Sequence, residues 1–172
     1  MRGVGTMQKY LQEYGEYIYH LAYLYVKDVH AAEEITQDVF YTYTKKQQQF
    51  RGEASLKTYL TRMAINRSHD ELRKMKRRTI LQTVLPFIQA VQSTEKEVMK
   101  EQVSLTIKEA LFTLPIRYRE VIVLHYYEDY SIKEIAQLLQ TNENTVRTRI
   151  RRAKEQLKEV LGELMEEGML YD

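Results

Sequence analysis

The sequence contains no cysteine and no tryptophan, and it has only two prolines and six glycines among its 172 residues. Without cysteine the chain can form neither a disulfide nor a thiolate-ligated zinc site. The scarcity of proline and glycine favours helix along nearly the whole chain. No apolar run approaches the ~18 residues of a membrane span, and the N-terminus has no apolar signal core. We therefore expect a soluble, cytoplasmic, all-α protein without membrane insertion.

The net charge of +2 conceals an uneven distribution of charge along the chain. Residues 1–78 carry five more basic than acidic residues, whereas residues 105–172 carry two more acidic than basic ones. Within the second region, residues 145–158 nevertheless hold four arginines and only one acid. Such local patches matter more to a polyanionic partner than the total charge does.

Apolar residues at helical spacing divide the chain into two blocks, residues 8–78 and 105–165, joined by residues 79–104. In the first block we expect one helix in the tyrosine-rich stretch "YLQEYGEYIYHLAYLYV" and a second with Ile35, Val39 and Tyr43 on one face. A third begins after the N-cap Ser55 and ends in the basic run "RKMKRR". The residues expected in the core of the first and third helices are Leu11, Tyr14, Ile18, Leu21, Ala22, Tyr25, Leu56, Leu60, Met63 and Leu72.

The joining segment contains an apolar stretch, "ILQTVLPFIQAV", at residues 80–91. Pro86 disfavours one continuous helix there. A solvated linker is normally more polar, so this stretch either packs on a neighbouring element or is covered by a partner.

The second block contains the layout of a helix-turn-helix in "SIKEIAQLLQTNENTVRTRIRRA". Ser131 and Glu134 predict a capping box before the first helix, and Asn142 predicts the N-cap of the second. We expect an interior formed by Ile135, Ala136, Leu139, Val146 and Ile150.

The opposite face of the second helix is rich in arginine. In DNA-binding helix-turn-helix proteins this helix lies in the major groove, with its early residues pointing at base edges. The residues expected there are Arg147, Thr148, Arg151 and Arg152, and Asn144 and Thr145 lie near the helix N-terminus, where phosphate binds favourably. The alternative is a solvated amphipathic helix unrelated to nucleic acid, which the unbalanced charge disfavours.

The basic run at the end of the first block also has two explanations. Cations near a helix C-terminus interact favourably with the helix dipole. Five basic residues within residues 73–78 exceed what that purpose needs. Two basic faces in separate blocks favour a single polyanion contacted at two places.

Three motifs, taken in order, resemble those of the extracytoplasmic-function sigma factors of the sigma-70 family. The stretch "AAEEITQDVF" is similar to the acidic motif of the family's polymerase-docking helix. "FRGEASLKTYLTRMAINRSHDELRKMKRR" resembles the segment that opens and reads the downstream promoter element. "LPIRYREVIVLHYYEDYSIKEIAQLLQTNENTVRTRIRRAKEQL" resembles the domain that reads the upstream element. The resemblance implies an all-α protein of two domains, at residues 8–78 and 105–165.

The resemblance also implies roles for particular residues. Contacts with the β′ clamp of core RNA polymerase would be made by Glu34, Gln37, Asp38 and Phe40. The polar break at residues 47–55 would capture a base flipped from the non-template strand, and Asn66 matches a family position near that pocket. The downstream element would be contacted by Phe50, Ser55, Tyr59, Asn66, Arg73, Lys74 and Arg77. The second domain would read the upstream element and contact the β flap, and an anti-sigma factor would restrain both domains.

The sequence departs from the family pattern at a few positions. Thr44 and Tyr59 stand where tryptophan is usual, and Ile65 replaces a common arginine. In the helix-turn-helix, Gln140 replaces the usual glycine of the turn, and Thr141 takes a usually apolar position. None of these changes removes a charge cluster.

The main alternative is a free-standing dimeric helix-turn-helix regulator. That class does not need the acidic helix, polar loop and basic helix of the first block. A purely partner-binding helical protein is disfavoured by the two basic faces. His30 lies near Glu33 and Glu34, but the acidic helix explains that grouping better than a metal site does. We expect no catalytic activity, no cofactor and no small-molecule substrate, because no convergent nucleophile, base or phosphate-binding loop is present.

Overall fold

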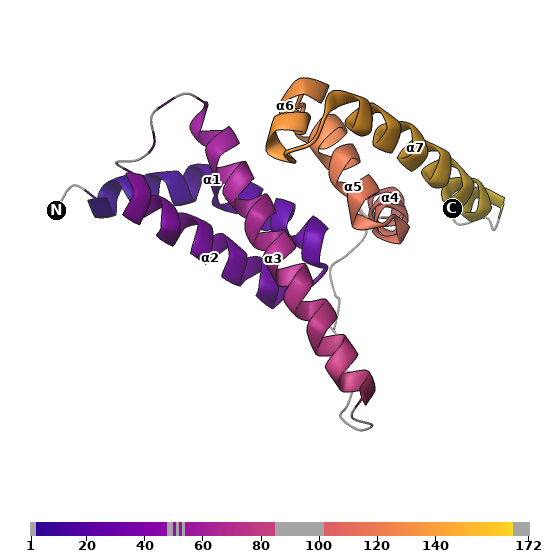
Figure 1. The fold of residues 1–172 in the computed structure, drawn as a ribbon, viewed down its shortest axis with the longest axis horizontal. Coiled ribbons are helices and arrows are strands. Elements are labelled where there is room, and N and C mark those ends of the chain that lie inside the picture. The colour runs from indigo at the N-terminus through magenta and orange to yellow at the C-terminus, as the bar shows by residue number, and fades with distance from the viewer. Residues whose placement is uncertain (1–2, 48–49, 51, 53, 85–101, 167–172) are drawn as a thin grey trace. The chain divides into compact units, whose positions relative to one another are not determined.

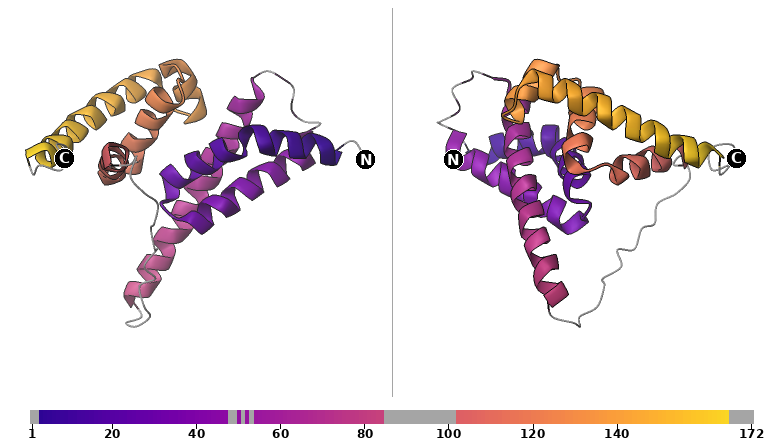
Figure 2. Two further views of the ribbon diagram at one scale, coloured as in Figure 1. Left: turned by 180° about the vertical axis from the view of Figure 1, so that it is seen from behind. Right: turned by 45° about the vertical axis from the view of Figure 1, so that its right-hand side comes forward.

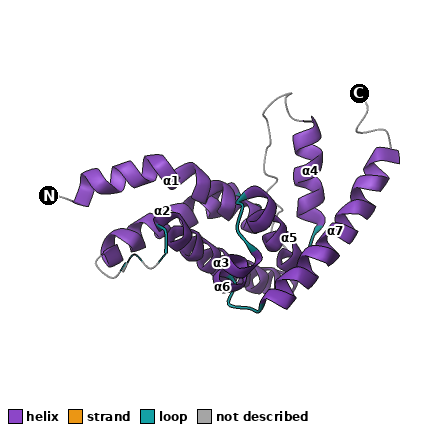
Figure 3. Cartoon of the chain, turned by 90° about the horizontal axis from the view of Figure 1, so that it is seen from above, coloured by secondary structure: helices purple, strands orange, loops and turns teal. Residues whose placement is uncertain are grey.

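The computed structural model describes residues 3–47, 50, 52, 54–84 and 102–166, and every regular element in this part of the chain is helical (Figures 1 and 3). The chain divides into two compact units, Met1–Gln89 and Ala90–Asp172. The first unit contains α1 (Gly3–Val26), α2 (Val29–Lys46) and α3 (Leu56–Val84). The second contains α4 (Gln102–Thr113), α5 (Ile116–Ile122), the π-helical turn η2 (Val123–Tyr127), α6 (Ile132–Leu138) and α7 (Glu143–Glu166). The all-α prediction is confirmed.

In the first unit, each of the three helices packs against the other two. The predicted stripe of α2 is confirmed, because Ile35, Val39 and Tyr43 are all buried. From α1 the core receives Ile18, Leu21, Ala22 and Tyr25, as predicted. Leu11 is 44% exposed, and its predicted burial is wrong. At that level of the bundle Tyr10 lies against α2 instead, with its ring centroid 5.7 Å from that of Tyr43.

Helix α3 begins as predicted and ends later than predicted. The Ser55 hydroxyl accepts a hydrogen bond from the Thr58 N–H at 3.1 Å, which satisfies a free donor of the first turn. Leu60 is fully buried, whereas Leu56, Met63 and Leu72 are only half-buried. The buried positions of the helix also include Thr61, Ala64, Ile65 and Ser68.

The basic run of residues 73–78 does not end α3, because the helix continues to Val84 (Figure 2). Residues 79–84 contain no helix breaker, and the first incompatible residue is Pro86, which also disfavours helix at the residue before it. The run therefore lies within the helix, and attraction to the helix C-terminus does not account for it. The expected joining segment is helical at both ends, over residues 79–84 and 102–104. Residues 85–91 of the apolar stretch lie outside the described residues.

In the second unit, α7 packs against α4, α5 and α6. The predicted burial of Ile135, Ala136, Val146 and Ile150 is confirmed. Leu138 is 4% exposed and takes the place in the core that was predicted for Leu139. Helix α6 ends at Leu138, so the helical spacing no longer applies one residue later.

The caps and the turn of the helix-turn-helix are formed by local contacts. Ser131 and Glu134 form the predicted capping box, and the Asn142 Oδ1 accepts from the Thr145 N–H at 2.7 Å. Gln140 has a φ of 51°. This left-handed conformation favours glycine, the residue usual at this position in the family that the sequence resembles. Gln140 adopts the same conformation at the cost of some strain.

Candidate nucleic-acid interface

The exposed face of α7 carries Arg147 and Arg151, as predicted. Arg147 lies 3.2 Å from Glu143, and Arg151 lies 2.8 Å from Glu155, each pair being one helical turn apart. The side chains of the two arginines are 54% and 65% exposed. Exposed ion pairs of this kind contribute little to stability. Both guanidinium groups therefore remain available to a stronger anionic partner.

Arg149 is held differently from its neighbours. Its Nη1 lies 3.2 Å from the Oε1 of Glu120 on α5, and the Glu120 side chain is only 5% exposed. This pair joins α7, the second helix of the helix-turn-helix, to α5, which lies before the motif. Sequence reasoning did not identify Glu120, because nothing local to "REVIV" indicates a partner 29 residues away.

A recess of about 350 Å³ lies between α5 and the N-terminal half of α7. It brings together four of the six predicted helix-turn-helix contacts, namely Asn144, Thr145, Thr148 and Arg152. Arg147 and Arg151 do not line it. The remaining lining residues are Arg117, Tyr118 and Arg149, none of which was predicted to contact DNA.

Tyr118 connects the two walls of this recess. It is 5% exposed, and it lines the recess together with Arg152 of α7. Hydrogen bonding from Arg152 is the main reason that the pKa of Tyr118 is lowered from its usual value; burial opposes this shift, and the charges of Arg117 and Arg152 add to it. The Arg117 guanidinium lies 4.8 Å from the centre of the same ring. One tyrosine thus holds an arginine on each wall.

In the first unit, the residues predicted to hold a flipped base lie around the start of α3. The ring of Phe50 is centred 5.0 Å from that of Tyr59, which in turn lies 6.2 Å from that of Tyr43. Tyr43 is buried, whereas Phe50 and Tyr59 are half-buried, so the edge of the cluster is accessible. Ser55 is occupied as the N-cap, and Asn66 is exposed farther along the helix. Residues 48, 49, 51 and 53 of the polar break lie outside the described residues.

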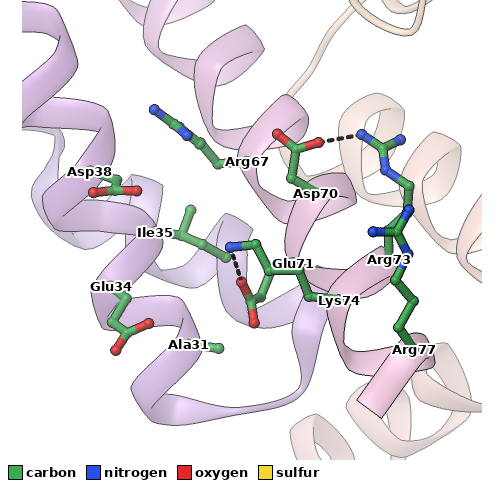
Figure 4. Close-up of a pocket in the computed structure, with 10 residues that line it drawn as sticks. All are labelled: Ala31, Glu34, Ile35, Asp38, Arg67, Asp70, Glu71, Arg73, Lys74 and Arg77. Atoms are coloured by element: carbon green, nitrogen blue, oxygen red, sulfur yellow. Dashed lines mark hydrogen bonds and ion pairs between the residues drawn. The ribbon is translucent and has the colours of Figure 1, made fainter. Parts of the chain in front are cut away.

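A second recess, of about 270 Å³, lies between α2 and α3 (Figure 4). Its α2 wall presents Glu34 and Asp38, and its α3 wall presents Arg73, Lys74 and Arg77. The structure therefore brings two of the four predicted polymerase contacts close to three of the seven predicted contacts of the downstream element. The other lining residues are Ala31, Ile35, Arg67, Asp70 and Glu71.

Figure 4 shows how the charges of this recess are arranged. Lys74 lies 3.0 Å from Glu71, and Arg73 pairs with Asp70, so each of these acids of α3 has a basic partner on its own helix. Glu34 and Asp38 make no ion pair within the part of the chain that the structure describes. The α2 wall therefore presents two carboxylates that are not held in ion pairs, facing the basic residues of α3 across the recess.

Two other predicted polymerase contacts are placed differently. Gln37 is exposed on α2 but does not line the recess. Phe40 is 1% exposed, because it points from α2 into the core of the first unit. Its side chain supports the helix from within and is not presented to a partner, which corrects the expectation of a surface contact.

The described residues contain no group of three His, Asp or Glu side chains placed to hold a metal ion. His30 is 3.9 Å from Glu33 in an exposed pair. Among the same residues, no helix is both long enough and apolar enough to span a membrane.

Comparison with known proteins identifies the family. The Sigma-70 region 2 model matches residues 10–79, and the Sigma-70, region 4 model matches residues 104–157. The chain is 33% identical over 161 residues to the ECF RNA polymerase sigma factor SigW of Bacillus subtilis (strain 168), covering 88% of this chain and 86% of the relative. The chain belongs to the ECF sigma factors. Sigma factors are regulatory proteins rather than catalysts, and RNA polymerase and promoter DNA are the partners that these two regions imply.

Other relatives agree with this assignment. The sigma factor is 27% identical over 166 residues to the RNA polymerase sigma-H factor of Pseudomonas aeruginosa, covering 91% of this chain and 86% of the relative. Its fold is similar to that of the sigma factor RpoE solved in complex with the anti-sigma factor NepR from Bartonella quintana, with a TM-score of 0.73, 24% identity, and 92% and 98% of the two chains covered. CnrH, solved in complex with the cytosolic domain of CnrY, shares the fold with a TM-score of 0.65 and 20% identity, covering 91% of this chain and 87% of CnrH.

Proposed function

We propose that this sigma factor binds core RNA polymerase and directs it to promoters, reading the downstream element with its first unit and the upstream element with its second. The observation that carries the proposal is the presence of two basic surfaces in two separate compact units, one on α3 and one on α7. The functional domains would be residues 8–78 and 105–165, with residues 79–104 connecting them. Transcription occurs in the bacterial cytoplasm, where we expect the protein to act.

Polymerase binding is assigned to α2. Glu34 and Asp38 present unpaired carboxylates, and Gln37 adds an exposed amide on the same helix. We propose that these three residues contact the β′ clamp. The buried Phe40 holds α2 against the core of the first unit. The second unit is assigned to the β flap.

Promoter opening is assigned to the start of α3 and to its basic run. Melting DNA costs about 1–2 kcal/mol for each base-pair step in lost stacking. Stacking of an extruded base on an aromatic side chain returns a comparable energy. The accessible edge of the Phe50–Tyr59 pair fits that role. Ser55 caps α3, and Asn66 lies farther along the same helix. The displaced strand would be held by Arg73, Lys74 and Arg77.

Upstream recognition is assigned to α7. Arg147 and Arg151 are exposed and paired only weakly, so they can exchange a surface carboxylate for guanine or phosphate. We propose that these two residues, together with Thr148, face the base edges. Asn144 and Thr145 lie in the first turn of the helix, where phosphate is favoured.

Regulation by an anti-sigma factor is part of the proposal. RpoE of Bartonella quintana was solved with the anti-sigma factor NepR, and this sigma factor shares its fold. A partner of the same class would restrain promoter binding by covering these surfaces.

The deciding experiment measures binding of the full chain to bacterial core RNA polymerase, followed by run-off transcription from a genomic promoter library. The proposal expects association and new start sites that core polymerase alone does not produce. Tight, sequence-specific DNA binding without polymerase association would overturn it and would support the free-standing dimeric regulator.

A further inference from the structure

The recess between α5 and α7 has an unusual chemical composition. Its lining includes three guanidinium groups, two hydroxyls of Thr145 and Thr148, one phenol and one amide, and it includes no carboxylate. Glu120 pairs with Arg149 next to the recess and offsets one of the three positive charges. The charges of Arg117 and Arg152 remain, since neither forms an ion pair within the described residues.

These two arginines are oriented by the same side chain. Arg117 lies over the face of the Tyr118 ring, at 4.8 Å from its centre, and Arg152 of α7 lines the same recess near the Tyr118 hydroxyl, whose pKa it lowers. A cation over an aromatic face and a hydrogen bond to a phenol both restrict the long arginine side chain. Tyr118 is itself only 5% exposed, so the two exposed arginines meet a side chain that the core holds in place, and both line one opening.

We propose that Arg117 and Arg152, held by Tyr118, bind one phosphodiester of the DNA on which α7 docks. Arg117 is thereby a DNA contact that lies on α5, outside the helix-turn-helix. The inference rests on the proposed function, since it assumes that α7 meets duplex DNA. Arginine forms paired hydrogen bonds with phosphate oxygens, and the hydroxyl of Thr145, in the first turn of α7, supplies a further donor at the same recess.

The recess is suited to a phosphate rather than to a base edge. Its guanidinium and hydroxyl donors converge from two helices onto one volume, and its lining has no carboxylate that would repel a phosphate. Phosphate contacts fix the register of a protein on the duplex, while base contacts specify the sequence. The sequence predicted that Arg152 faces base edges together with Arg147 and Arg151. In this inference it contacts the phosphate backbone of the DNA instead. Binding at this point would fix how far α7 rotates in the groove.

The test uses holoenzyme reconstituted from the full chain and core polymerase, and a duplex selected from a random DNA pool by that holoenzyme. Arg117→Ala is expected to weaken binding roughly three- to tenfold on the selected duplex and on its point variants alike, and to reduce the slope of log affinity against log salt by about 1. Arg117→Lys should recover part of the loss. Lys158→Ala is the matched control, because Lys158 is an exposed cation of α7 that does not line the recess.

A second measurement separates a phosphate contact from a structural role. Uncharged methylphosphonates are introduced one at a time along the upstream half of the duplex. One position should weaken wild-type binding and have no further effect on the Arg117→Ala holoenzyme, while the other positions affect both proteins equally.

The possible outcomes distinguish a failure of the phosphate-recess inference from a failure of the proposed function. If wild-type holoenzyme selects a duplex, and Arg117→Ala leaves its affinity and salt slope unchanged, the phosphate recess is wrong and the sigma-factor function stands. Equal sensitivity of both proteins to every methylphosphonate would also overturn the recess. If the wild-type protein neither joins core polymerase nor selects DNA, the proposed function itself fails.

Discussion

Arg149 of α7 and Glu120 of α5 form an ion pair between two helices, with Nη1 and Oε1 3.2 Å apart and the Glu120 side chain 5% exposed. Arg149 is 27% exposed, so the pair lies at the border between interior and solvent. Its location means that one of the four arginines of residues 147–152 is occupied in supporting the fold. The other three arginines of this stretch, Arg147, Arg151 and Arg152, are exposed.

Glu120→Gln should destabilise the second unit by about 2 kcal/mol, between the values of exposed and fully buried ion pairs. The reason is that Arg149 loses its partner while it remains partly desolvated. Urea unfolding of the single variants and of the Glu120→Gln/Arg149→Met double variant measures the coupling between the two residues. Strictly additive losses would show that the pair contributes nothing.

Arg151→Ala should weaken binding to the selected upstream element by about 1–3 kcal/mol and relax the preference at one base pair. This result differs from that expected for Arg117, whose loss should be uniform across sequences. Binding to the selected duplex and to a set of single-base variants distinguishes the two. A uniform loss for Arg151→Ala would make it a second phosphate contact.

Tyr59→Ala should slow promoter opening, because the accessible aromatic edge that it forms with Phe50 is lost. The stacking of one base contributes about 1–3 kcal/mol. Fluorescence of 2-aminopurine placed in the downstream element reports the opening. Tyr59→Phe retains the ring and is the matched control. Equal opening by Tyr59→Ala and wild-type holoenzymes would exclude a stacking role.

Asp38→Asn should weaken association with core polymerase, because it removes a carboxylate that has no basic partner on its own chain within the described residues. We expect a loss of about 0.5–2 kcal/mol, typical of a charged contact at the edge of an interface. Glu33→Gln is the control, since Glu33 lies on the same helix and is paired with His30. Biolayer interferometry on immobilised core polymerase gives both dissociation constants, and equal values for the two variants would remove Asp38 from the interface.

The capping box of α6 should respond to pH. The Ser131 hydroxyl and backbone N–H both hydrogen-bond the Glu134 carboxylate, and the hydroxyl has the larger effect in lowering the pKa of that group. A carboxylate whose pKa is lower in the folded state stabilises the fold above its unfolded pKa, and this contribution disappears as the pH falls through the folded value. Ser131→Ala should therefore cost about 1 kcal/mol at neutral pH and less in acid.

Hydrogen exchange at the Ser131 and Glu134 amides measures this loss locally. Thr58→Ala is a suitable control in the other unit, because it alters the first turn of α3 without touching α6. A cost that does not change between neutral and acidic pH would exclude the carboxylate as its source.

The sequence by itself determined the features that depend on near neighbours. The caps at Ser55, Ser131 and Asn142 form as predicted, because each contact spans three residues. The helical periods of α2 and α7 identified buried stripes, and the order of motifs identified the family. Where the helix ended early, at Leu138, the same spacing misassigned Leu139.

Only the tertiary structure decided which side chains meet across helices. The contact of Glu120 with Arg149, and that of Tyr118 with Arg152, join residues 29 and 34 positions apart in the chain. Helical spacing predicts which face of a helix is buried, but it does not predict how far one helix is rotated or shifted against the next. That relative placement assigned Arg149 to the fold, Phe40 to the core, and Arg117 to the proposed phosphate site.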